Sequence, residues 1–112
     1  ALTHLSAGLT FGVHTGDGAA ALEELKIIKA MGVSPGAWIW IHAQNEKNRS
    51  IHIQVAKEGG WVSFDGLNDD SVQQYVKFLL PLLRKEGFTE KEIKQVFEIN
   101  PANALTVKIR KG

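Results

Sequence analysis

The sequence contains no cysteine, which excludes disulfide bonds and thiolate metal ligands and fits a cytoplasmic protein. Its 13 Lys and Arg residues nearly balance its 12 Asp and Glu residues, so nothing in the composition favours nucleic acid or an anionic membrane as a partner. The longest apolar runs, residues 37–43 and 78–83, are too short to span a bilayer. The 112 residues suffice for one domain but not for a closed eight-stranded β/α barrel, which needs roughly 200–250 residues.

Three segments with strand-like patterns alternate with two helix-like segments. The expected strands are residues 9–14, 37–43 and 61–65, and the expected helices are residues 19–31 and 50–58. Residues 37–43 are apolar on both faces, which is typical of a parallel strand covered by helices. Ser50 is the predicted N-cap of the second helix. The order predicts an α/β fold with a parallel βαβαβ core over residues 9–66.

Residues 68–105 have a helical pattern and complete a single domain that covers residues 1–112. An apolar stripe at helical spacing consists of Val72, Tyr75, Val76, Leu79, Leu80 and Leu83. Pro81 lies inside this stripe and predicts a kink or a break. Thr89 and Glu92 have the spacing of a capping box, and Pro101 suits the first turn of a further helix. We expect the basic tail at residues 106–112 to be frayed.

His14, His42 and Asp65 occupy corresponding places at the ends of the three expected strands. Because functional groups gather at the carboxyl edge of parallel β/α sheets, the two imidazoles could share one metal ion, and zinc is the usual partner of such ligands. The spacing leaves a second interpretation open, in which both histidines only form hydrogen bonds within a polar loop layer. His4 and His52 fall outside this pattern, and His52 is interpreted as a surface or packing residue.

Strict alternation along each strand predicts which side chains share a face. The three predicted sets are Thr10, Gly12 and His14; Trp38, Trp40 and His42; and Trp61, Ser63 and Asp65. In this interpretation the small residues of the first strand make room for the indoles of the second, inside a barrel-like interior.

The segment Gly16–Ala21 matches the G-x-G-x-x-A variant of the dinucleotide-binding fingerprint between a strand and a helix. However, His14 and Thr15 separate the first strand's apolar residues from the first glycine, and the second strand has no carboxylate at its tip for a ribose. Dinucleotide binding is therefore a weaker alternative to a flexible βα loop.

Several phrases, in this order, resemble the phosphotriesterase-related family of the amidohydrolase superfamily. They are Gly12-Val-His-Thr-Gly16, Ala21-Leu-Glu-Glu-Leu25, Gly32-Val-Ser-Pro35, Trp38-Ile-Trp-Ile-His-Ala-Gln44, Gly60-Trp-Val-Ser-Phe-Asp-Gly66, Leu80-Pro-Leu-Leu-Arg84, Gly87-Phe-Thr89 and Asn100-Pro-Ala-Asn-Ala104. Together these phrases extend over most of the chain.

The resemblance implies a (β/α)8 TIM barrel with two divalent metals, usually zinc, which hydrolyses a phosphotriester, lactone or other ester with metal-activated water. It implies that residues 12–14 and 39–42 are the family's fifth and sixth strands. His14 and His42 would then hold the more exposed metal. Asp65 resembles the seventh-strand aspartate near the pocket and is the candidate catalytic residue.

The chain departs from the family pattern in two places. The first-strand His-x-His pair and the fourth-strand bridging ligand lie upstream of anything in this sequence. The last barrel strand, with its aspartate, has no counterpart between Asp65 and the helical part. We therefore expect the C-terminal part of such a hydrolase with an internal deletion, weak or inactive as an isolated chain.

The alternative is a non-catalytic fragment or scaffold. Three parallel strands would expose sheet edges and an apolar face with Trp38, Trp40 and Trp61, which favours self-association or binding of a complementary barrel segment. In neither interpretation do we expect nucleic acid or a membrane as a partner.

Overall fold

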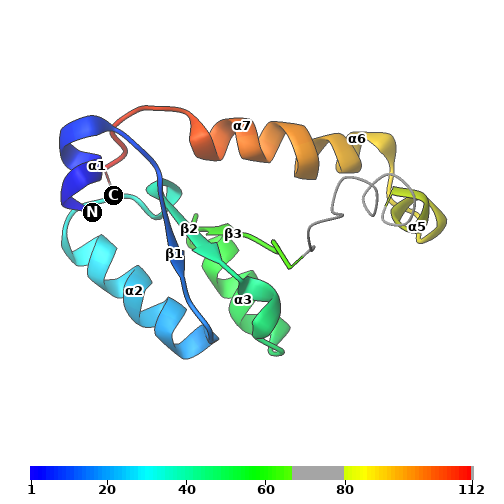
Figure 1. Cartoon of the computed structure of the whole chain (residues 1–112), viewed down its shortest axis with the longest axis horizontal. Helices are drawn as coiled ribbons and strands as arrows, with labels where there is room; N and C mark the ends of the chain where they lie inside the picture. Colours follow the sequence, from blue (N-terminus) through cyan, green and yellow to red (C-terminus); the bar gives the residue numbers. More distant parts are fainter. Residues whose placement is uncertain (67–79, 112) are drawn as a thin grey trace. The chain divides into compact units, whose positions relative to one another are not determined.

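The computed structural model describes residues 1–66 and 80–111, and the apolar stripe before Leu80 lies outside the described residues. The chain forms two compact units (Figure 1). The first consists of Ala1–Asp65 together with the residues from Ala104 onward, and the second is Gly66–Asn103. None of the helices in the described ranges is long and apolar enough to cross a membrane.

A three-stranded parallel sheet forms the centre of the first unit. Its strands are β1 (Phe11–His14), β2 (Trp38–Ile41) and β3 (Trp61–Val62), in the order β1-β2-β3. Phe11 pairs with Trp38, and Ile39 pairs with Trp61. The fold is therefore mixed α/β with a parallel sheet, as the alternation of elements predicts, although each strand is shorter than expected.

The helices of this unit precede or connect the strands. They are α1 (Leu2–Ala7), α2 (Gly18–Ala30) and α3 (Arg49–Lys57), with single 3₁₀ turns η1 (Pro35–Ala37) and η2 (Ala43–Asn45). Asp17 caps α2 by accepting the Ala20 N–H. The prediction that Ser50 caps the next helix is wrong, because Asn48 is the N-cap of α3 and its side chain accepts the Ser50 N–H.

The core lies between the sheet and the helices α2 and α3. Trp38 and Trp40 are fully buried there, and their buried partners are Ala21, Leu25, Ile28, Ala43 and Val55. The expectation that the indoles share a face with Gly12 is wrong. The register pairs Phe11 with Trp38 and Val13 with Trp40, so the indoles share the helix-covered face with Phe11 and Val13.

The opposite face of the sheet carries Gly12, His14, Ile39, Ile41 and Trp61, as the register and the alternation along each strand require. We call this set the open face, because Gly12 and His14 are exposed and the other three are half-buried. A Cβ atom on Gly12 would lie 2.4 Å from Ile41 Cδ1, so the Ile41 side chain lies over the glycine.

The N-terminal helix and the C-terminal tail meet beside each other (Figure 1). Lys108 N–H donates to the Gly8 carbonyl over 2.9 Å, and Arg110 N–H donates to His4 Nε2 over 2.7 Å. Ser34 N–H donates to the Arg110 carbonyl. The tail is thus tied down by backbone hydrogen bonds, and the prediction that it is frayed is wrong. We call His4, Gly8, Lys108 and Arg110 the terminal clasp.

The second unit is helical in its described residues. It contains α5 (Leu80–Lys85), α6 (Glu90–Lys94), the π-helical segment η4 (Gln95–Ile99) and the start of α7 (Asn100–Leu105). The capping box at Thr89 and Glu92 is confirmed, with both reciprocal hydrogen bonds present. Pro101 lies in the first turn of α7, as predicted, although η4 leads into α7 without a break.

Candidate metal centre

His14 and His42 come together at the carboxyl edge of the sheet. His14 Nδ1 lies 2.7 Å from His42 Nε2, and the two rings meet edge to face with centroids 4.6 Å apart. The sequence predicts that these two residues converge, and the structure brings them into direct contact.

The route to this contact differs from strict alternation along the strand. His14 pairs with Ile41, so a regular strand would direct the next residue, His42, toward the opposite face. His42 instead has a φ of 67°, and it is the only non-glycine residue with positive φ in the described chain. This left-handed residue directly follows β2, and its backbone turn directs the His42 side chain toward His14. Such backbone conformations are unfavourable for a residue with a Cβ atom and concentrate at functional sites.

Asp65 holds His42 from the side away from His14. Its Oδ1 accepts the His42 backbone N–H over 2.9 Å, and its Oδ2 lies 3.0 Å from His42 Nδ1. Partial burial acts to raise the pKa of Asp65, but hydrogen bonds from the His42 backbone, its own backbone and the His42 ring outweigh it, so the pKa lies below its usual value. An ionised Asp65 accepts the proton on His42 Nδ1, so the His42 Nε2 lone pair accepts the His14 Nδ1–H, and a metal bound by both nitrogens would take the place of that proton.

The two histidine nitrogens fit the requirements of a divalent metal in type and access. Tetrahedral zinc bound at ~2.0–2.1 Å to two imidazoles separates their nitrogens by about 3.3 Å, so the pair must open by about half an ångström. The side chains of His42 and Asp65 are 39% and 35% exposed, so an ion can reach the pair. Within the described residues, no group of three or more His, Cys, Asp or Glu side chains is arranged to hold a metal.

A buried network fixes the residue that follows His14. Thr15 Oγ1 donates to Glu24 Oε1 over 2.7 Å, and the Thr15 carbonyl accepts the Trp40 indole N–H over 3.1 Å. Glu24 Oε2 is buried without a hydrogen-bond partner in the described structure. Sequence reasoning missed Glu24, although its position three residues after the buried Ala21 places it toward the sheet side of α2.

The N-terminus of α2, where the dinucleotide fingerprint lies, is occupied by the chain's own carboxylates. Glu46 Oε2 accepts the Gly18 N–H over 2.8 Å, and Glu46 Oε1 accepts the Asn48 N–H over 2.7 Å. These backbone hydrogen bonds, Asn48 first and Gly18 second, hold the pKa of Glu46 below its usual value. A pyrophosphate would have to displace Glu46 to reach this helix end, which disfavours the dinucleotide alternative.

The remaining two histidines have other roles. The His52 Nε2 lies 2.8 Å from the Ala43 carbonyl, and its ring packs against Trp40 and Phe64. His4 is fully buried in the terminal clasp, a position that nothing in the sequence pattern indicated.

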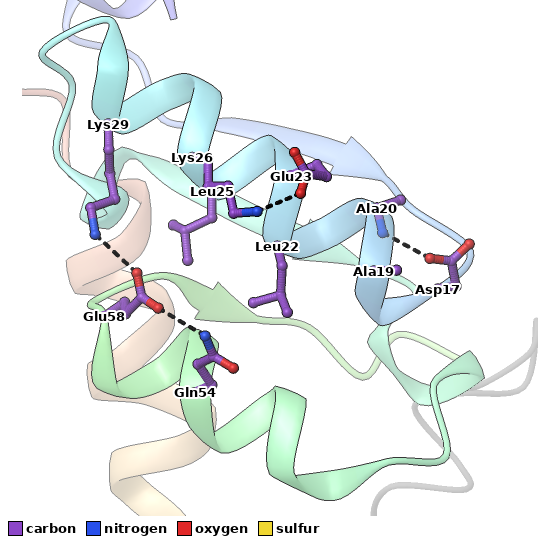
Figure 2. A pocket seen from close by; sticks show the side chains of 10 residues that line it. All are labelled: Asp17, Ala19, Ala20, Leu22, Glu23, Leu25, Lys26, Lys29, Gln54 and Glu58. Atoms are coloured by element: carbon purple, nitrogen blue, oxygen red, sulfur yellow. Dashed lines mark hydrogen bonds and ion pairs between the residues drawn. The ribbon is translucent and has the colours of Figure 1, made fainter.

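A groove of about 840 Å³ lies between α2 and α3 (Figure 2). Leu22 and Leu25 point into it from α2, and its charged groups are engaged: Lys29 Nζ lies 3.0 Å from Glu58 Oε2, and Gln54 donates to Glu58 Oε1. No histidine lines it. The groove therefore offers volume without the chemistry present at the histidine pair, and we place the candidate site at the pair.

Comparison with known proteins gave no match to a protein-family model, to a curated protein or to a solved structure. The function is therefore inferred from the residues of this chain and their geometry.

Proposed function

We propose that this chain is an incomplete (β/α)8 barrel of phosphotriesterase type, in which His14 and His42 bind zinc or another divalent metal. The observation that carries this proposal is the approach of His14 Nδ1 to His42 Nε2 within 2.7 Å at the carboxyl edge of a parallel sheet. This is the edge at which β/α proteins place their functional groups.

Each neighbouring group has a defined part in this proposal. Asp65 sets the tautomer and orientation of His42, as carboxylates beside metal-binding histidines commonly do. The Thr15–Glu24 hydrogen bond and the Trp40 indole anchor the backbone beside His14. When bound, the ion supplies Lewis acidity toward water and toward the oxygen of an ester, lactone or phosphotriester.

We expect the isolated chain to hydrolyse such substrates weakly or not at all. Two imidazoles form only part of a catalytic site, because a catalytic zinc commonly has three protein ligands and an open position. Metal binding is therefore the primary activity expected of this chain, and ester hydrolysis is secondary to it.

Metal analysis of the purified chain tests the proposal directly. The wild-type protein is incubated with zinc, dialysed and analysed beside His14→Ala, His42→Ala and the matched control His52→Ala. We expect zinc to remain with the wild type and His52→Ala and to be lost from the other two variants. Each preparation is then assayed with an aryl phosphotriester, an aryl ester and a lactone.

A wild-type chain that retains no zinc would refute the proposed site. Equal loss of zinc from His52→Ala would show that binding does not depend on the pair. Stabilisation of the zinc-free chain by NAD would instead support the dinucleotide alternative at Gly16–Ala21.

A further inference from the structure

The histidine pair leaves half of a zinc coordination sphere to be filled. Structural zinc sites in proteins are tetrahedral with four protein ligands. The pair offers two nitrogens, and the described residues hold no arranged group of three metal-binding side chains. Two ligands must therefore come from water or from another molecule.

The nearby carboxylates are already engaged within the chain. Asp17 accepts the Ala20 N–H at the start of α2, and Glu46 accepts the Gly18 and Asn48 N–H groups. Asp65 accepts from both the backbone and the ring of His42. Moving any of the three toward an ion would break hydrogen bonds that hold a helix end or the pair itself.

The surroundings of the pair suit a second copy of the same chain. His14 lies on the open face beside Ile41, and Ile39, Ile41 and Trp61 retain exposed apolar surface there. Parallel sheets are normally covered on both faces, so covering this one is favourable. In a two-fold interface the same patch of both copies meets, and an axis that passes beside the histidine pair would bring the two pairs to one point.

We propose that one zinc ion joins two copies of this chain through His14 Nδ1 and His42 Nε2 of each copy. This inference rests on the proposed metal site and adds the partner that completes it. An ion closed by four imidazoles has no position left for water or substrate, so the dimer is a resting form without hydrolytic activity. Dimer formation requires one zinc per two chains, and excess zinc favours single chains that each hold their own ion.

Light scattering during a zinc titration tests the inference on the full chain. The metal-free protein is expected at its chain mass of 12.3 kDa. The mass should double at half an equivalent of zinc, return on addition of a chelator, and fall again in large zinc excess. His14→Ala and His42→Ala should stay at the chain mass at every zinc concentration, and His52→Ala should behave as wild type.

His14 is exposed, so His14→Ala should fold, and circular dichroism checks that it does. As a second variant, Asp65→Asn should still dimerise at the same ratio but need about 10–100-fold more zinc. One zinc per chain without any rise in mass would overturn the dimer while leaving the metal site intact. Absence of zinc binding would overturn both, and a dimer that persists in chelator would overturn the metal bridge alone.

Discussion

The histidine pair and the terminal clasp both depend on imidazole nitrogens, but the groups that these nitrogens meet differ. In the clasp, His4 is fully buried, accepts the Arg110 N–H at Nε2 and contacts the Leu9 carbonyl through Nδ1. Backbone groups occupy both ring nitrogens of His4, so neither nitrogen is available to a ligand. In the pair, His14 and His42 direct nitrogens at each other near the surface.

This comparison shows that the surroundings of a histidine decide whether it stabilises the fold or can bind a ligand. A buried imidazole whose nitrogens are both satisfied by the backbone stabilises the fold. An exposed imidazole whose tautomer is set by a carboxylate keeps a lone pair available for a metal. The comparison predicts that substitutions at the clasp change the free energy of unfolding, whereas substitutions at the pair change zinc affinity.

The largest effect is expected for His4→Leu. Leucine fills a similar volume but removes the two ring nitrogens that bond the Arg110 N–H and the Leu9 carbonyl, and the loss of such a partner at a part-buried group costs about 1–3 kcal/mol. We expect the free energy of unfolding to fall by about 2–5 kcal/mol in urea titrations, with zinc binding at the pair retained.

His52→Leu is the matched control for that substitution. His52 is half-buried and makes one side-chain hydrogen bond, to the Ala43 carbonyl, so a loss of about 1 kcal/mol is expected. Equal losses for the two leucine variants would contradict the structural role assigned to His4.

The next effect is expected for Gly8→Ala. Gly8 has a φ of 71°, and a Cβ atom there would lie 3.0 Å from the Lys108 carbonyl carbon of the tail. Gly32→Ala is its control, because Gly32 has a φ of 74° with nothing within 4 Å of the added atom. Both substitutions should lose about 1–2 kcal/mol of unfolding free energy to backbone strain.

Only Gly8→Ala should lose more than this strain, because the added methyl group also presses on the tail. Urea titration of both variants measures the difference. If Gly32→Ala were the more destabilising of the two, the close approach of the tail to Gly8 would be wrong.

The sequence predicts the parallel βαβαβ order because apolar periodicity and turn residues are local signals. Those signals do not reach the terminal clasp, because the hydrogen bond between His4 and Arg110 joins residues at opposite ends of the chain. The helix α1 was missed because it is six residues long and its N-cap, Ala1, makes no side-chain capping hydrogen bond. Long-range contacts therefore account for most of what the sequence did not indicate.

The sequence predicts that the residues of the candidate site converge, but it does not predict their geometry. The ends of neighbouring parallel strands predict that His14 and His42 are close, and they are. Period-two alternation then places His42 and Trp40 on one face, which fails because His42 has a left-handed backbone conformation. Positive φ is uncommon for any residue with a Cβ atom, so period-two alternation does not reveal this turn.

Asp65→Asn is expected to lower the zinc affinity of the histidine pair without changing the stability that the terminal clasp provides. The amide can no longer accept strongly from His42 Nδ1, so zinc affinity should fall about 10–100-fold, the usual effect of removing such a carboxylate. Asp17→Asn is the control, because asparagine caps a helix as well as aspartate does and removes the same charge at the same sheet edge. Isothermal titration with zinc measures both, and equal affinities for the two variants would exclude Asp65 as a positioning residue.

The smallest expected effect is the loss of stability at acid pH. Glu46 and Asp65 both have folded-state pKa values below their usual values, Glu46 through the Asn48 and Gly18 N–H groups and Asp65 through His42 against the opposing effect of burial. A group with a lowered folded pKa stabilises the fold above its unfolded pKa, about 4.3 for Glu and 3.9 for Asp, and this stabilisation is lost as the pH falls through the folded pKa.

With respect to these two groups, the urea midpoint should therefore stay level from pH 7 to about pH 5 and should decline below pH 5. Glu46→Gln should flatten that decline, because its amide does not titrate. A decline of unchanged slope in Glu46→Gln would instead place the acid-sensitive groups elsewhere in the chain.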